Sequence, residues 1–275
     1  MKPLLIGAVA GTLLAISLVT QAKPLDDYKA EKISERTYVV HGPLEQPNPK
    51  NRGFMNNPAF IIAEKGVIVV DPGSTVQIGK MLLKQIREVT DKPIVAVFNS
   101  HVHGDHWLGN QAFAEENPDV KIYANPQMIK LAKAGLSKHW LDMMQRLTNK
   151  ASEGTKAVLP NTELTDGERV SFGDITIKAH LTEQAHTKTD AMFEIVEEKV
   201  LFTGDNAPRD RIIRLDDASY RGNIAAMDKM IDLSPEIVVP GHGQTGDKQI
   251  LENYKQYLTV VYETAKTLMD EGMES

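Results

Sequence analysis

Residues 101–106 read His-Val-His-Gly-Asp-His, and this stretch decides how the chain is interpreted. So many polar side chains are hard to bury, because each group that leaves water needs a compensating partner. A divalent metal ion supplies one, and zinc takes neutral imidazole and carboxylate ligands at about 2.0–2.2 Å. The apolar stretch 94–100, Ile-Val-Ala-Val-Phe-Asn-Ser, has strand character and leads into these residues. We therefore expect the ligands at the end of a strand, where open α/β sheets place their sites.

Composition narrows the class of protein. The 275 residues are enough for one large domain or two small ones, with 41% hydrophobic and 25% charged residues as in ordinary globular proteins. The net charge of -6 leaves no basic stripe for a nucleic-acid partner and says little about the substrate, which we expect to be a small molecule. Because the chain has no cysteine, no metal ligand is a thiolate and no cysteine acts as a nucleophile. The oligomeric state is not indicated.

Residues 1–22 resemble a secretory signal peptide. Lys2 gives a positive start, residues 4–20 carry no charge, and Thr-Gln-Ala at 20–22 forms a small-x-small cleavage site. An uncleaved membrane anchor is the alternative, but the apolar stretch is shorter than the roughly 20 residues that span a bilayer comfortably. We expect a periplasmic or secreted protein without stable membrane insertion after cleavage.

The remaining pattern alternates strands and helices. Expected strands are 37–40, 59–63, 66–70, 94–100, 175–179, 191–196, 200–202 and 237–239. Expected helices are 75–88 with Ser74 as N-cap, most of 126–150, about 223–233 and about 247–270. This order predicts an α/β protein whose two halves pack sheet against sheet.

Three more candidate ligands lie at the ends of expected strands or beside them: His186, Asp205 and His242. A lone histidine is more often structural, but the joint placement of these residues beside the 101–106 run favours metal ligation. The histidines outside this context are interpreted as structural or solvent-exposed: His41, His139 and His180.

The ordered set of ligands resembles the metallo-β-lactamase superfamily over residues 37–245. Asp71, after a strand, also matches the first motif of that superfamily. The resemblance implies an αββα four-layer sandwich over residues 23–275, with two metal ions at one edge. The implied ligands are His101, His103 and His186 for the first metal, Asp105, His106 and His242 for the second, and Asp205 bridging both. Asp71 is expected to hold the ligand loop through hydrogen bonds without touching metal.

The identity of residue 205 indicates the branch of the superfamily. Class B1 and B2 lactamases have cysteine there and class B3 enzymes lack a bridging aspartate, so Asp205 is closer to the glyoxalase II-like set. The signal peptide and residues 54–58 resemble periplasmic zinc hydrolases associated with sulfur-oxidation and quinoprotein gene clusters. Ala185 departs from the glycine that many relatives have before the histidine.

The resemblance implies a hydrolase with two Zn²⁺, or with iron or manganese in their place. A metal-bridged hydroxide would attack the carbonyl of an ester, thioester, lactone or amide, β-lactams included. Asp105 is the expected catalytic residue, as a ligand that also orients the water. A mononuclear iron persulfide dioxygenase is the alternative, but it would make less use of His106 and His242. A non-catalytic binding protein would usually have lost ligands.

The substrate itself cannot be identified from the sequence, although loops 43–58 and 126–160 would shape its pocket. One group of side chains either lines that pocket or belongs to the core and the solvated face of a helix: Met55, Trp140, Met143, Met144 and Arg146. Three arginines after Asp205 either attract an anionic substrate or form a solvated surface: Arg209, Arg211 and Arg214. The sequence does not decide between these alternatives, either for the pocket side chains or for the arginines.

Overall fold

The computed structural model describes residues 24–212 and 214–273. The expected signal peptide at 1–22 lies outside this part of the chain. Within it, no helix combines the length and the apolar character that crossing a bilayer requires.

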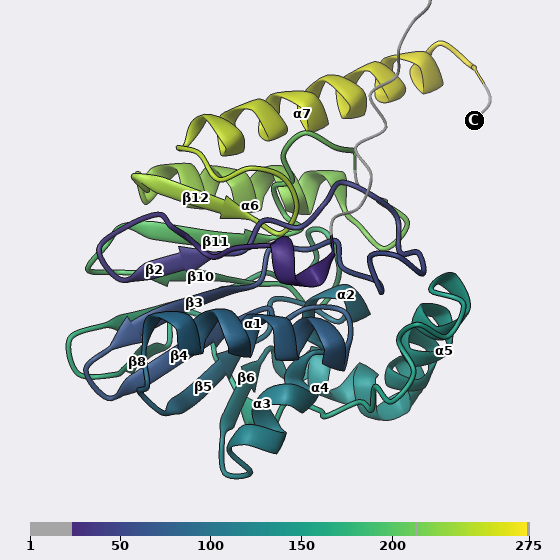
Figure 1. Ribbon diagram of the computed structural model, residues 1–275. Helices are drawn as coiled ribbons and strands as arrows, with labels where there is room; N and C mark the ends of the chain where they lie inside the picture. Colours follow the sequence, from purple (N-terminus) through teal and green to yellow (C-terminus); the bar gives the residue numbers. More distant parts are fainter. Residues whose placement is uncertain (1–23, 213, 274–275) are drawn as a thin grey trace, which may run out of the picture.

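Two β-sheets form the centre of the described structure (Figure 1). The first has the order β1 to β7: Glu31–Lys32, Thr37–Val39, Ala59–Ala63, Gly66–Val70, Ile94–Phe98, Lys121–Ala124 and Thr162–Glu163. The second has the order β12-β11-β10-β9-β8, with β8 to β12 at Arg169–Ser171, Thr176–Leu181, Ala191–Ile195, Val200–Gly204 and Ile237–Pro240. Strands β4 to β7 run parallel to one another, as do β11 and β12.

Helices cover the outer face of each sheet (Figure 1). Helices α1 (Val76–Val89) and α3 (Asn110–Glu116) pack on the first sheet, and α6 (Tyr220–Asp232) and α7 (Gln249–Asp270) pack on the second. The short α2 (Gly104–Trp107) packs with α4 (Pro126–Leu131) and α5 (Ser137–Leu147) beside the sandwich. A single-turn 3-10 helix, Leu25–Asp27, precedes β1. The expected αββα sandwich is therefore confirmed.

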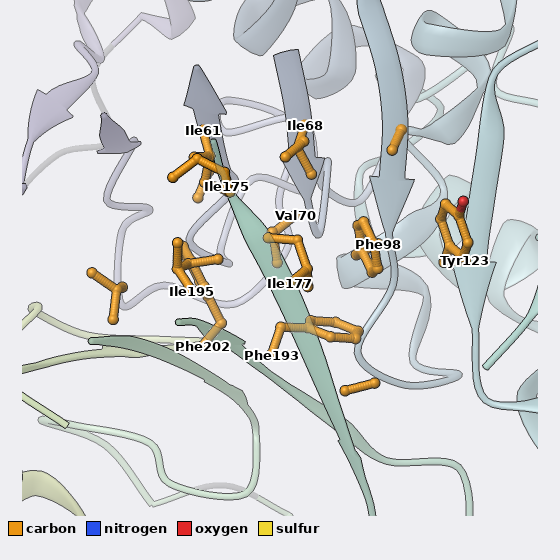
Figure 2. Packing of buried hydrophobic residues seen from close by; sticks show 14 of the residues in the cluster. Ile61, Ile68, Val70, Phe98, Tyr123, Ile175, Ile177, Phe193, Ile195 and Phe202 are labelled. Carbon is orange, nitrogen blue, oxygen red and sulfur yellow. The ribbon is translucent and has the colours of Figure 1, made fainter. Parts of the chain in front are cut away.

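The core lies between the two sheets, where their inner side chains meet (Figure 2). The Phe98 ring from the first sheet packs edge-on against Phe193 from the second, with 5.2 Å between centroids, and stacks on Tyr123 at 4.6 Å. Strand β4 is buried along its whole length, which explains its unbroken apolar sequence. This packing fixes the edge at which the strand ends of both sheets meet.

The strands expected at 59–63 and 66–70 occur with those bounds. The N-cap assignment at Ser74 was wrong, because the Ser74 hydroxyl donates to the carbonyl of Gly53 at 2.6 Å. Thr75 caps α1 instead, through a hydroxyl that accepts from the amide of Ile78. The helical stretch after Pro126 is broken at Gly135, whose φ of 126° ends the regular helix.

Candidate metal centre

The candidate ligands gather at one edge of the sandwich because of the strand directions. Parallel strands β4 and β5 end beside each other, which places Asp71 next to the start of the 101–106 run. Parallel strands β11 and β12 end likewise before Asp205 and His242. The loop between β9 and β10 carries His186. The Ala191 amide donates to the carbonyl of Ser100 at 2.7 Å, which ties the two sheets together at this edge.

The structure brings six of the candidate ligands into two groups of three. In the group of His101, His103 and His186, the potential ligand atoms lie within 4.8 Å of one another. The Nε2 atom of His186 is 3.1 Å from Nδ1 of His103, and Nε2 of His101 is buried without a hydrogen-bond partner. The second group consists of Asp105, His106 and His242. There, Asp105 Oδ2 lies 3.2 Å from Nε2 of His242 and 3.5 Å from Nε2 of His106.

The seventh candidate, Asp205, lies between the two groups. Its Oδ2 atom is 3.3 Å from Nε2 of His242 and 3.8 Å from Nε2 of His186, while Oδ1 is 3.3 Å from Nε2 of His106. This close approach depends on Gly241, where an added Cβ would lie 2.3 Å from Asp205 Oδ1. Oδ2 of Asp205 therefore faces a histidine nitrogen of each group, and Oδ1 faces one of the second group.

A buried hydrogen-bond network orients the histidines of the 101–106 run. Asp71 Oδ1 accepts from the Ser100 amide at 2.8 Å, and Oδ2 accepts from the Ser100 hydroxyl at 2.6 Å. The same Oδ2 lies 2.9 Å from Nδ1 of His106, and the Ser100 hydroxyl lies 3.0 Å from Nδ1 of His101. If each Nδ1 carries the proton, the Nε2 atoms of both rings are left free as ligands.

The rings of His242 and His103 are likewise oriented by polar contacts of one ring nitrogen. Nδ1 of His242 lies 2.7 Å from the carbonyl oxygen of Met55, which leaves Nε2 of His242 facing the two aspartates. Nε2 of His103 lies 3.5 Å from Asp217 Oδ2, which leaves Nδ1 facing His186. The backbone at His186 is held by Asn206, whose Oδ1 accepts from the His186 amide at 3.2 Å.

Burial and charge shift the pKa values of these histidines in opposite directions. Burial, together with neighbouring imidazoles, lowers the pKa of His101 well below its usual value and that of His186 to about 3. For His106 and His242 burial acts in the same sense, but the carboxylates of Asp205 and Asp105 outweigh it and raise both pKa values. Unpartnered buried nitrogens beside two buried carboxylates form a donor set that suits borderline cations such as zinc.

Several supporting residues were missed from sequence. Ser100 directly precedes the histidine run, and its hydroxyl was a detectable signal that we overlooked. Asp217 and Asn206 lie near candidate ligands in sequence or space but carry no distinctive spacing. Asn57 also supports the site, because its Nδ2 donates to the carbonyls of Pro240 and Gly243 on either side of His242. The Met55 contribution is a backbone carbonyl, which no side-chain pattern reveals.

The other histidines lie outside the cluster. His41 contacts Thr245, with its Nε2 2.9 Å from the threonine hydroxyl. His180 is buried against Glu194, with Nε2 2.8 Å from Oε2. His139 is exposed on α5, and the ring of its neighbour Trp140 lies 5.0 Å from the ring of His103. Of the pocket candidates, Trp140 is thus beside the site.

The other side chains that the sequence proposed for the pocket differ in how far they are buried. Met144 is 2% exposed and belongs to the core beneath α5, whereas Arg146 is exposed. Met143 is half-buried on the same helix, and the Met55 side chain is buried. Among the three arginines, Arg211 reaches the site, with Nη1 3.2 Å from Nδ1 of His242.

Comparison with known proteins agrees with this fold. A sequence profile of the metallo-beta-lactamase superfamily matches residues 51–242, from the loop before β3 to the last candidate ligand. The chain belongs to the metallo-beta-lactamase superfamily.

Two curated relatives and two solved structures illustrate the match. The chain is 26% identical over 255 residues to a linear primary-alkylsulfatase of a Pseudomonas species, covering 78% of this chain and 47% of the relative. It is 22% identical over 207 residues to a type 2 metallo-beta-lactamase of a Bacillus species, covering 71% of this chain and 70% of the relative. The fold matches a metallo-beta-lactamase from Pontibacter korlensis with a TM-score of 0.66 and 18% identity. The match covers 84% of this chain and 99% of the other chain. It also matches a double mutant of the sec-alkyl sulfatase PisA1 with a TM-score of 0.72 and 17% identity. This match covers 90% of this chain and 44% of the other chain. The chain therefore spans about half the length of the alkylsulfatases that it matches.

Proposed function

We propose that this protein is a dinuclear zinc hydrolase that cleaves an ester, thioester, lactone or amide bond, β-lactams included. The observation that carries the proposal is the position of Asp205 between two groups of three ligands, five of them buried and His103 partly buried. His101, His103 and His186 would hold one ion, and Asp105, His106 and His242 the other. Two such ions would supply an activated water at neutral pH and polarise the scissile carbonyl.

The protein's own residues prepare the site for this chemistry. Asp71 and Ser100 fix the ring orientation of His101 and His106, so these ligands need no rearrangement when metal binds. Burial excludes bulk water from the ligands, which strengthens every electrostatic interaction among them. The structure thus supports a preorganised centre.

Asp105 is the residue that we assign to orienting the attacking water. Burial opposes its ionisation, but the imidazoles of His106 and His242 outweigh burial and lower the pKa of its carboxyl. An ionised carboxylate only accepts hydrogen bonds, so Asp105 can receive one from a water molecule. The same side chain lies within 3.2 Å of His242 Nε2, where it would share the second ion.

Sulfate-ester hydrolysis is a second candidate, favoured by the match to the alkylsulfatase over 78% of this chain. That relative is about twice as long, so activity on alkyl sulfates stays a proposal for this chain. The relatives reported above do not favour the iron dioxygenase alternative. We also propose that the protein is exported, on the evidence of residues 1–22 alone.

Metal analysis with substrate screening tests the proposal. The purified full chain is analysed for bound elements and then assayed with a thioester, a lactone, a β-lactam and a primary alkyl sulfate. We expect about two zinc ions per chain and hydrolysis that chelation abolishes and zinc restores. A single iron per chain, or no hydrolysis of any of these substrates by the zinc-loaded protein, would reject the proposal.

A further inference from the structure

Asn57, in the loop before β3, binds the backbone on both sides of the candidate ligand His242. Its Nδ2 group donates to the carbonyl oxygen of Pro240 at 2.9 Å and to that of Gly243 at 2.7 Å. Its backbone amide donates to the carbonyl oxygen of Gly241 at 2.8 Å. Asn57 precedes a strand of the first sheet, whereas His242 follows the edge strand of the second. One residue therefore holds the backbone of this ligand from the opposite half of the sandwich.

The backbone around His242 needs such a restraint because its own sequence provides little. Glycines lie on both sides of the ligand, and Gly243 has a φ of 94°. Glycine adopts many backbone conformations at similar free energy, so the local sequence does not fix where His242 lies. Hydrogen bonds from outside the loop supply the restraint, and Asn57 contributes three of them.

The side chain of Asn57 uses its donors and its acceptor at the same time. Both N–H groups of Nδ2 are taken by the two carbonyls of the His242 loop, while Oδ1 accepts from the Gly42 amide at 3.1 Å. Asn57 is 3% exposed, so water does not replace these bonds when the side chain is removed. An aspartate at this position would keep the acceptor for Gly42 but would lack the donors.

The ring of His242 is held by the same short segment. Its Nδ1 lies 2.7 Å from the carbonyl oxygen of Met55, two residues before Asn57. By binding the His242 loop, Asn57 fixes this carbonyl relative to the histidine that it orients. With the ring proton on Nδ1, the Nε2 atom stays free as a ligand on the side of Asp105 and Asp205.

The ligands of the first group are held by other residues. The Ser100 hydroxyl lies 3.0 Å from Nδ1 of His101, and Asn206 Oδ1 accepts from the amide of His186. Within the part of the chain that the structure describes, no hydrogen bond of Asn57 reaches a member of the first group. The contacts of Asn57 thus concern one of the two groups of ligands.

We propose that Asn57 is a positioning residue for His242 and thereby sets the affinity for the second metal ion, without affecting the first. The proposal rests on the proposed dinuclear function and names a residue that controls it. Removing the side chain leaves two carbonyls and one amide without their partner, so the His242 loop loses its fixed position. Residues that orient metal ligands typically change metal affinity by 10- to 100-fold.

Asn51 provides a matched control on the same loop. Its side chain is fully buried, and its amide is also bound to backbone groups. Its Oδ1 accepts from the amides of Asn48 and Gly53 at 2.9 Å each, and its Nδ2 donates to the carbonyl of Gln46 at 3.0 Å. Asn51→Ala therefore damages the loop as Asn57→Ala does, but it breaks no side-chain bond to the His242 loop.

Zinc binding is measured by dialysing the metal-free full chain against buffers of fixed free zinc, followed by elemental analysis. His242→Ala identifies the binding step that belongs to the second ion, because this step should disappear. Asn57→Ala is expected to move the same step to roughly 10- to 100-fold higher free zinc, with the other step unchanged. Asn57→Asp, which is closer in shape, is expected to move it likewise. Asn51→Ala should bind both ions like the parent protein.

Hydrogen exchange of residues 238–246 in the metal-free protein tests the positioning directly. Exchange should be faster in Asn57→Ala and Asn57→Asp than in the parent protein and Asn51→Ala. Unchanged zinc binding in both Asn57 variants, or equal shifts of both steps, overturns the proposal. A parent protein that binds fewer than two ions rejects the dinuclear function, and the exchange still decides whether Asn57 holds the His242 loop. A parent protein that binds two ions without hydrolysis rejects the hydrolase function alone.

Discussion

Asp71 and His106 are joined in the interior of the protein, with Oδ2 of the aspartate 2.9 Å from Nδ1 of the histidine. Both side chains are almost completely buried. Asp71 has a φ of 46°, a backbone conformation that residues other than glycine rarely adopt. The strained backbone turn after β4 thus places one carboxylate where it meets both Ser100 and His106.

Asp71→Asn should weaken metal binding without removing a ligand. An asparagine amide oxygen can still accept from the Ser100 amide, but its NH₂ group cannot accept from His106. We expect zinc affinity to fall by about 10- to 100-fold, as for other residues that orient ligands. Competition with a chromogenic chelator measures this change. The control is Asp26→Asn, an exposed aspartate paired with Lys84, and an Asp71→Asn variant with parental affinity and activity would refute the role.

Zinc binding should release protons at neutral pH. In the metal-free protein burial would lower the pKa of His242, but Asp205 and Asp105 outweigh it and raise the pKa to about 9, and the pKa of His106 is raised likewise. His242 is therefore protonated at pH 7.5, and zinc must displace its proton. Apparent zinc affinity should rise with pH towards 9. Calorimetry in two buffers of different ionisation enthalpy detects the release, and identical heats in both buffers would contradict it.

The stability contributed by Asp190 should decrease as pH rises. Burial raises the pKa of its carboxyl to about 7 in spite of hydrogen bonds from the amide and hydroxyl of Thr187. The folded protein thus holds this proton up to about pH 7, whereas the unfolded chain releases it near its usual value of 3.8. Between these values the unfolded state binds fewer protons, so stability falls as pH increases.

Asp190→Asn isolates this effect. We measure the free energy of unfolding of the parent protein minus that of the variant, so that other titrating groups cancel. The difference should decrease from pH 4 to pH 7 by at most ~4 kcal/mol and then stay constant. A difference that does not change over this range would show that Asp190 ionises normally in the folded protein.

Gly241→Ala should disrupt the centre through a single methyl group. The added Cβ would lie 2.3 Å from Asp205 Oδ1 and 2.8 Å from the carbonyl carbon of Gly204. We expect loss of the second zinc ion and a destabilisation of about 1–3 kcal/mol, measured by elemental analysis and denaturant unfolding. Gly154→Ala is the control, because its Cβ meets nothing within 4 Å although its φ is positive. Two retained zinc ions in Gly241→Ala would contradict the prediction.

Local sequence predicted β3, β4 and α1 closely. Strands β3 and β4 have continuous apolar residues, and the amphipathic pattern of α1 gave its extent to within about a residue. The N-cap of α1 was misassigned because Ser74 and Thr75 are both good caps, and only the contact of Ser74 with Gly53 distinguishes them. Strands β1 and β7 are two residues long, and pairing with neighbouring strands defines them rather than a pattern of their own.

By itself the sequence determined the superfamily and the αββα fold, because the 101–106 run is followed in order by His186, Asp205 and His242 and preceded by Asp71 after a strand. Only the tertiary structure decided how His186, Asp205 and His242 meet that run, since the parallel strand ends of two packed sheets bring residues more than 80 positions apart into contact. The tertiary structure also decided which of the three arginines after Asp205 lies beside the metal centre. Arg209, Arg211 and Arg214 are equivalent in sequence, and Arg211 differs because the fold places it, without a carboxylate partner, beside His242.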